Sequence, residues 1–328
     1  MARVAIIIPS YNHAQFLSEA IESVLDQTYT DWTLTIIDDG SSDNSMDLAT
    51  RYATSDPRIH VYQNSANLGT YGTQQRGLDA TDSEYVAILN SDDKWHSQKL
   101  HHQVEKLESQ PEAVAHIVMG EQINQHSEII VTDDFINWEG FELCELLPIL
   151  LPENNFLASG VLWQRNELKF DTSCRYSGDH VALLNASLRG PISISNERLT
   201  FWRQHESNSY KRSPNQLVEE IRLRKSIRQF DGWYHVRTIE DALIDRGRAM
   251  NLLHLSALYT LCGKYHDAKG ILGEASQLMP YHPSVRKRKL LLSLSGSLLR
   301  KTLFPNEPFP ERSVLEQIES IKLIEFDA

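Results

Sequence analysis

An unbroken apolar run near the start of the chain, Val4 to Ile8, most constrains the fold, and Pro9 ends it. A strand with no polar residue on either face is typical of the middle of a parallel sheet that helices cover on both sides. The next segment, residues 14–27, repeats its apolar residues every three or four positions and therefore predicts an amphipathic helix. A buried strand followed by such a helix is the repeating unit of an α/β fold.

The same alternation continues through the first two thirds of the chain. Further strands are expected at residues 33–37, 59–63, 85–89, 113–119, 156–164 and 192–202. Further helices are expected at residues 73–80, 97–109 and 179–188, with a hairpin and a helix around 141–150 inside the less regular stretch 120–155. The predicted fold class is α/β, with a mostly parallel central sheet and flanking helices.

The pattern changes near Pro214, after which β-branched runs almost vanish and helix-forming residues dominate. The length of 328 residues suggests about two domains. We place the boundary in the polar stretch 206–214, which predicts an α/β domain over residues 1–210 and an all-α region over 211–328.

The charge balance disfavours some classes of partner. The sequence has 32 Lys and Arg residues against 44 Asp and Glu residues, a formal net charge of −12. This sign argues against a nucleic-acid binder, so no nucleic-acid partner is expected. Three cysteines without a CxxC pair encode neither a disulfide framework nor a thiolate zinc site, and a reducing compartment is the simple interpretation.

No stretch reaches the ~18 apolar residues that a membrane-spanning helix needs. The best remaining candidate, Leu290–Leu303, contains Ser and Gly and follows the basic run Arg286–Lys289. A helix buried in the second domain is the favoured interpretation, and a helix at a membrane interface is the alternative. We expect a cytoplasmic protein, with residues 211–328 as the region for any contact with the inner face of the membrane or with a partner protein.

Paired aspartates follow two of the predicted strands, Asp38-Asp39 after the second and Asp92-Asp93 after the fourth. A turn or a helix N-cap explains either pair alone. Both pairs, however, lie at the carboxyl edge of the sheet, where ligands of open α/β folds bind. Together they favour a phosphate-rich ligand held through Mn²⁺ or Mg²⁺. Tyr11, directly after the first strand, is placed to lay its ring on a nucleotide base.

Several segments, in this order, resemble the opening of the family 2 glycosyltransferases, and the resemblance covers roughly residues 3–210. The matching segments are Ile6–Asn12, Ser23–Thr28, Ile37–Asp43, Asn67–Gly69 and Glu84–Asp93. Two later segments also match. Ser177–His180 resembles the acceptor-side segment that carries the catalytic base, and Trp202–His205 resembles the Arg-x-His end of the catalytic domain.

The resemblance implies a GT-A catalytic domain and an inverting, metal-dependent transfer of a sugar. The implied donor is a nucleotide-sugar, with a UDP-sugar favoured, and the implied acceptor is a hydroxyl of a glycan or lipid-linked molecule in surface polysaccharide synthesis. The donor-binding residues that it implies are Pro9, Tyr11, Asp38, Asp39, Arg76, Asn90, Ser91 and Asp92. Asp92, Asp93 and His205 would hold Mn²⁺ or Mg²⁺, and Asp179 would be the general base.

The chain departs from the family pattern at three positions. Asn90 replaces the first acid of the Asp-x-Asp motif, and Gly178 replaces the first acid of the pair that ends in the base. Gly77 follows Arg76 where Asn is usual, so a solvated helix arginine is the alternative for Arg76. The departures at Asn90 and Gly178 motivate a second hypothesis, an inactive relative that binds a nucleotide-sugar or docks a partner through its helical tail. A nucleotidyltransferase ranks last, because no Gly-rich basic loop follows the first strand.

The helical tail contains a segment, residues 257–280, that weakly resembles one tetratricopeptide-type helix pair. Its small residues stand where two helices must approach, and Pro280 ends it. About three such repeats are needed for a stable solenoid, so a generic helical domain is the alternative.

Overall fold

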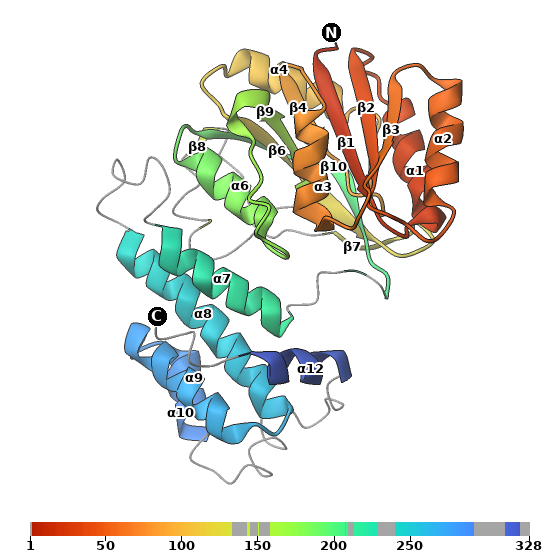
Figure 1. Cartoon of the computed structure of the whole chain (residues 1–328). Coiled ribbons are helices and arrows are strands. Elements are labelled where there is room, and N and C mark those ends of the chain that lie inside the picture. The colour runs from red at the N-terminus through yellow and green to blue at the C-terminus, as the bar shows by residue number, and fades with distance from the viewer. Residues whose placement is uncertain are drawn as a thin grey trace. The chain divides into compact units, whose positions relative to one another are not determined.

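The computed structural model describes residues 2–132, 143–144, 150, 158–206, 208, 213–227, 240–291 and 312–321. Tertiary contacts divide the chain into two compact units. The first consists of Met1–Leu147 and Asn155–Asn208, and the second of Pro148–Asn154 and Ser209–Ala328. Figure 1 shows the first unit as a sheet with helices and the second as helices.

One sheet organises the first unit, with strand order β3-β2-β1-β4-β9-β6-β10-β5. The strands are β1 (Val4–Ser10), β2 (Trp32–Asp38), β3 (Ile59–Gln63), β4 (Tyr85–Ile88), β5 (Lys94–Trp95), β6 (Ala115–Ile123), β7 (Ile129–Thr132), β8 (Leu143–Cys144), β9 (Val161–Gln164) and β10 (Ile192–Arg203). From β3 to β4 all neighbours are parallel. β9 then enters antiparallel to both β4 and β6, so the mostly parallel sheet expected from the sequence is mixed beyond β4.

The register of the parallel strands aligns the residues that end them. Ser10 of β1 lies opposite Asp38 of β2, and Asp38 lies opposite Gln63 of β3. The carboxyl ends of these strands therefore meet at one edge of the sheet, as the sequence analysis required.

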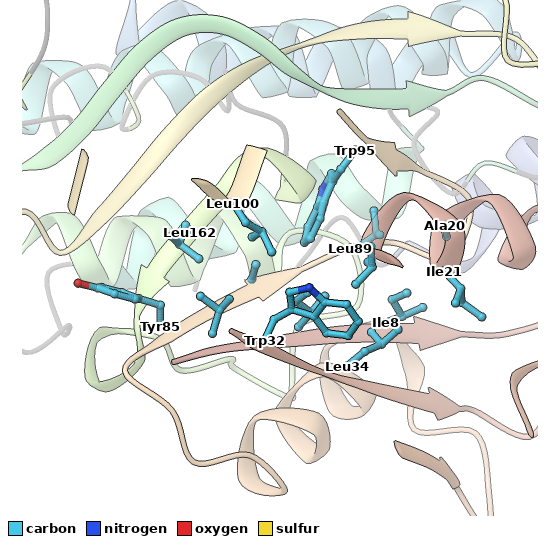
Figure 2. Packing of buried hydrophobic residues seen from close by; sticks show 14 of the residues in the cluster. Ile8, Ala20, Ile21, Trp32, Leu34, Tyr85, Leu89, Trp95, Leu100 and Leu162 are labelled. Atoms are coloured by element: carbon cyan, nitrogen blue, oxygen red, sulfur yellow. The ribbon is translucent and has the colours of Figure 1, made fainter. Parts of the chain in front are cut away.

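Helices cover both faces of the sheet. They are α1 (Ala14–Leu25), α2 (Ser45–Ser55), α3 (Gly69–Asp79), α4 (Lys99–Ser109) and α6 (Gly178–Ser187). Side chains alternate along β1. Ile6 and Ile8 accordingly belong to the core cluster with α1 and α4, whereas Ile7 faces Gly77 of α3. Figure 2 shows part of this core, in which Ile8 and Leu34 of the sheet pack near Ala20 and Ile21 of α1.

The second unit is helical in its described residues. Its helices are α7 (Pro214–Ser226), α8 (Glu240–Leu261), α9 (Tyr265–Leu278), α10 (Pro283–Leu291) and α12 (Arg312–Ser320). α8 and α9 form a helix pair joined at Gly263, whose φ of +76° suits glycine. The Ser256 hydroxyl donates to the carbonyl of Ala268 at 2.9 Å across this pair, and both residues are buried.

Most of the elements predicted from the sequence are present, with four differences. Helix α2 and the short strand β5 were not predicted. The strand expected from residue 156 begins at Val161, after a 3-10 turn at Ala158–Gly160. The helix expected around 141–150 is wrong at Leu143–Cys144, which pair with β10; most of its other residues lie outside those described.

In the part of the chain that the structure describes, no helix combines the length and the hydropathy needed to cross a membrane. Most of Leu290–Leu303 lies outside those residues.

Candidate active site

The end of β2 is held by its own aspartates. Asp38 is buried, and its Oδ2 accepts hydrogen bonds from the backbone N–H groups of Gly40 (3.2 Å) and Ser41 (3.0 Å) and from Nε2 of Gln63 (3.1 Å). Gly40 has a φ of +80°, which the tight turn requires. Asp38 thus shapes the turn beside the site.

Asp39 fixes the loop that opens α3. Its Oδ1 accepts from Asn64 Nδ2 at 2.6 Å and from the backbone N–H of Leu68 at 2.8 Å, and its Oδ2 accepts from the N–H of Gly69 at 2.9 Å. Arg76 of α3 donates to Gln63 O at 2.9 Å and to the side-chain oxygen of Asn64. Asn64 therefore links Arg76 to Asp39, and the resemblance places both residues in the donor site.

Tyr11 follows β1 with its side chain about half exposed (49%), as a residue that stacks on a planar ligand must be. Pro9 lies within β1 opposite Ile37 of β2. Asn12, directly after Tyr11, has a φ of +54°, and its Oδ1 accepts from the N–H of Ser42 at 2.8 Å. This turn brings the end of β1 to the turn after β2.

The structure brings three possible metal ligands together after β1, after β4 and after β10. One ligand atom from each of His13, Asp92 and His205 lies within 4.8 Å of the others. His205 Nε2 is 3.0 Å from Asp92 Oδ2, and the two imidazole rings lie edge to face with centroids 5.7 Å apart. Burial lowers the pKa of His13, more than the Asp92 carboxylate raises it, which favours the neutral ring that a metal needs.

Imidazole and carboxylate groups in this combination fit Mn²⁺, and also other divalent transition metals. The predicted ligands Asp92 and His205 are both in this group. His13 is not among the ligands expected from the sequence. Its only signal there is its position after a strand that ends at the same sheet edge.

Asp93, the third expected ligand, makes different contacts. It is buried, and its Oδ2 accepts from Ser159 Oγ at 2.6 Å and from Asn90 Nδ2 at 3.2 Å. Its Oδ1 accepts from the backbone N–H of Arg203 at 3.0 Å. Burial, together with the charge of Asp92, raises the pKa of Asp93. Ser91 stands between Asn90 and Asp92 in the sequence, and its hydroxyl lies 2.8 Å from Nδ1 of His13 and so orients that ring.

Arg203 is a further residue of the site. Its side chain is fully buried, and its Nε donates to the carbonyl oxygen of Asp92 at 2.8 Å. The guanidinium also donates to Glu19 Oε2 at 3.0 Å and lies 4.9 Å from the ring centre of Phe16. The Phe16 ring in turn lies 4.7 Å from that of His205. In the sequence, Arg203 is part of the Arg-x-His segment, but no role in the site is predicted for it.

Asp179 lies in the first turn of α6. Its Oδ1 is 3.2 Å from the hydroxyl of Tyr71, a buried residue of α3. Gly178, beside it, has no room for a side chain, because an added Cβ would lie 2.5 Å from the Tyr71 ring. The absence of an acid at residue 178 therefore has a steric explanation.

Known proteins match this chain as follows. Residues 5–128 match the model for "Glycosyl transferase family 2". An uncharacterized glycosyltransferase of Nostoc sp. is 30% identical over 232 residues, which is 66% of this chain and 70% of that protein. The putative teichuronic acid biosynthesis glycosyltransferase TuaG of Bacillus subtilis is 39% identical over 102 residues, 31% of this chain and only 40% of TuaG.

Among solved structures, S. aureus TarS residues 1–349 in complex with UDP-GlcNAc superposes with a TM-score of 0.65 at 15% sequence identity. The superposition covers 97% of this chain and 91% of that one, and it shows the same fold. The first unit has the GT-A architecture expected from the sequence. The chain belongs to glycosyltransferase family 2, because residues 5–128 match the family model and a relative matches it over 66% of its length.

Proposed function

We propose that this chain is an inverting, metal-dependent glycosyltransferase that moves a sugar from a UDP-sugar to a hydroxyl of a glycan or lipid-linked acceptor in surface polysaccharide synthesis. The observation that carries the proposal is the grouping of His13, Asp92 and His205 at the sheet edge where the strands ending near Asp39 also terminate. Metal ligands beside a nucleotide site suit a donor that carries a diphosphate.

The names of relatives and structural neighbours support the donor and acceptor classes. One relative, 40% identical over 101 residues and matched over 39% of its length, is the Escherichia coli "UDP-Glc:alpha-D-GlcNAc-diphosphoundecaprenol beta-1,3-glucosyltransferase WfgD". TarS has been solved with UDP and with UDP-GlcNAc. A mannosyltransferase of Pyrobaculum calidifontis, with a TM-score of 0.52, was solved with GDP-Man and Mn²⁺.

In the proposed reaction the residues of the chain have separate tasks. Tyr11 stacks on the base, Asp39 with its loop fixes the base edge, and Arg76 stands beside that loop. Asp92, His205 and His13 would hold Mn²⁺, because two imidazoles do not suit the oxygen-preferring Mg²⁺. The ion would help to neutralise the charge that develops on the leaving diphosphate. Asn90 donates to the Asp93 carboxylate, and this bond stabilises the turn after β4.

Asp179 takes the proton of the acceptor hydroxyl. An ordinary aspartate, with a pKa of about 3.9, is too weak a base to deprotonate an alcohol before attack. Proton transfer is therefore concerted with the attack of the acceptor oxygen on the anomeric carbon, opposite the leaving diphosphate. Alignment of donor and acceptor supplies much of the remaining rate.

The inactive-relative hypothesis is not favoured. Each of the two departures that motivate it has a local structural reason. Asn90 donates to Asp93, and Gly178 leaves room for the Tyr71 ring. Asp92 and Asp179 are retained.

For the second unit we propose a docking role, toward a partner protein or the inner face of the membrane, with the α8–α9 pair as a single tetratricopeptide-like unit. We also propose a cytoplasmic location.

Calorimetric titration of the purified protein with UDP, GDP, CDP and dTDP, each with Mn²⁺ and again with EDTA, tests the function. We expect UDP to bind tightly only with Mn²⁺. Binding of none of the four nucleotides under either condition would contradict the proposal, and equal binding with EDTA would remove its metal dependence.

A further inference from the structure

Tyr71 is a buried tyrosine of α3 whose hydroxyl reaches a different part of the chain. The hydroxyl lies 3.0 Å from the carbonyl oxygen of Tyr176 and 3.2 Å from Oδ1 of Asp179. Its ring lies nearly parallel to that of Phe170, with centroids 6.3 Å apart and 26° between the planes. The ring is therefore held from the side while the hydroxyl meets the start of α6.

The ring also excludes a side chain at the residue before Asp179. A Cβ added to Gly178 would lie 2.5, 2.6 and 2.8 Å from three Tyr71 ring carbons, closer than real Cβ atoms approach. The motif that this segment resembles has an acid at that position. A tyrosine at residue 71 in this orientation and an acid at residue 178 exclude each other, so the two positions form one unit.

We propose that Tyr71 is a positioning residue for Asp179 and occupies the space of the acid that precedes the base in similar enzymes. This inference rests on the proposed role of Asp179. A hydrogen bond from the tyrosine hydroxyl to Oδ1, which also accepts from the backbone N–H of His180 at 2.8 Å, adds a side-chain contact that restricts the rotation of the carboxylate. A positioned base gains rate because the reacting atoms start close to their geometry in the transition state.

The hydroxyl has one proton and two acceptors, and this suits both stages of the transfer. During the reaction the O–H bond of the acceptor breaks, an O–H bond forms on Asp179, the acceptor oxygen bonds to the anomeric carbon, and the leaving diphosphate takes the electron pair of the bond that breaks. Before the step, Tyr71 donates to the Asp179 carboxylate. Afterwards its proton can turn to the carbonyl of Tyr176, which leaves the tyrosine oxygen able to accept from the newly formed carboxylic acid.

The test uses Tyr71→Phe, which removes the hydroxyl and keeps the ring against Gly178. The readout is UDP release with Mn²⁺ from UDP-glucose, UDP-N-acetylglucosamine and UDP-galactose, with water as the acceptor. We expect kcat to fall about tenfold with the KM of the donor unchanged, because the loss concerns the base and not donor binding. Tyr52→Phe is the matched control, since Tyr52 also donates to a carboxylate, Glu22 at 2.7 Å, on the outer helices.

A second measurement separates this inference from the proposed function. Asp179→Asn is assayed alongside, and the unfolding free energies of Tyr71→Phe, Asp179→Asn and the double variant are measured in urea. Loss of turnover in Asp179→Asn, a kcat loss in Tyr71→Phe and non-additive unfolding energies support the inference. Wild-type kcat in Tyr71→Phe, with turnover lost in Asp179→Asn, overturns the inference alone. Wild-type turnover in Asp179→Asn, or no UDP release by the wild type, overturns the proposed function and the inference with it.

Discussion

The guanidinium of Arg203 donates its Nε hydrogen to the backbone carbonyl oxygen of Asp92 at 2.8 Å, across 111 residues of sequence. The backbone N–H of the same arginine donates to Asp93 Oδ1 at 3.0 Å. The last residue of β10 therefore fixes both aspartates after β4. The chain turns from this residue toward His205, so one arginine sets the geometry on two sides of the candidate metal site.

Arg203→Lys tests this arrangement. Lysine keeps the charge but cannot donate at once to Asp92, to Glu19 and to the turn after β6, so several partly buried acceptors lose a partner. We expect a loss of about 2–4 kcal/mol in the free energy of unfolding, measured in urea. Arg51→Lys, at an exposed position of α2, is the control and should cost under ~1 kcal/mol. Equal losses in the two variants would contradict this role of Arg203.

The grouping of His13, Asp92 and His205 predicts that His13 and Asp92 both bind the metal ion. Asp92→Ala and His13→Ala should each weaken Mn²⁺-dependent UDP binding at least about tenfold, because each removes one of three ligands. Calorimetry with and without EDTA measures the effect. His126→Ala removes an exposed histidine and should leave the binding unchanged. Wild-type affinity in His13→Ala would reduce the site to Asp92 and His205.

Asp179→Asn separates binding from chemistry. We expect UDP binding to stay within about twofold and sugar transfer to fall by ~10²–10⁴, the range that a positioned general base contributes. Calorimetry and the rate of UDP release, measured on one preparation, give both quantities. Near wild-type transfer would exclude Asp179 as the base.

Gly178→Ala places a methyl group against the Tyr71 ring, where the nearest atom is 2.5 Å away. We expect a loss of about 1–3 kcal/mol in unfolding free energy, the usual cost of overpacking. The matched control is Gly273→Ala in α9, where a Cβ meets nothing within 4 Å. That variant should stabilise by about 0.5–1 kcal/mol, because alanine is the better helix residue. A neutral Gly178→Ala would mean that Tyr71 can move aside.

Lys99 predicts a pH dependence of stability. Its side chain is fully buried, Nζ donates to Gln103 at 2.7 Å and lies 3.9 Å from the centre of the Trp95 ring, and burial lowers its pKa well below the usual value. The unfolded chain regains an ordinary lysine, with a pKa of about 10.4, and so binds more protons than the folded state between the two pKa values. This lysine therefore makes stability rise with pH across that window, by up to ~1.4 kcal/mol per pH unit.

Urea unfolding at pH 7 and pH 9 checks this sign. We expect Lys99→Met to gain less stability over the interval than the wild type, and Lys169→Met, at an exposed position, to gain as much as the wild type. If Lys99→Met and the wild type gain equally, Lys99 keeps its proton in the folded protein.

Local patterns predicted β1, β2 and β4 well, because these strands are short, mostly apolar runs that end in turn residues. Helix α2 escaped notice because only Ser45 and Ala49 of its 11 residues are buried, so its apolar stripe is weak. Strand β5 is only two residues long, and its antiparallel partner in β10 lies more than 100 residues later. Pairing across such distances depends on tertiary contacts that no local pattern encodes.

In the candidate site too, local motifs predicted some residues, and others depend on tertiary contacts. Motif order picked out Asp92, His205 and Asp179, whose side chains make the contacts described above. His13, Tyr71 and Arg203 depend on contacts between distant elements: His13 meets Ser91 78 residues away, and Tyr71 meets Asp179 108 residues away. A single sequence contains these residues but not their proximity.

The connection between the two units begins next to the metal group. His205 donates its backbone N–H to the side chain of Asn208, which itself donates to the carbonyl of Arg203 at 2.9 Å, and the first unit ends at Asn208. The end of the first unit is therefore a hydrogen-bonded segment that links Asn208 to Arg203 and to the candidate ligand His205. An engineered exchange of the helical unit must join its new partner after residue 208, because a junction only a few residues earlier would remove a ligand along with the linker.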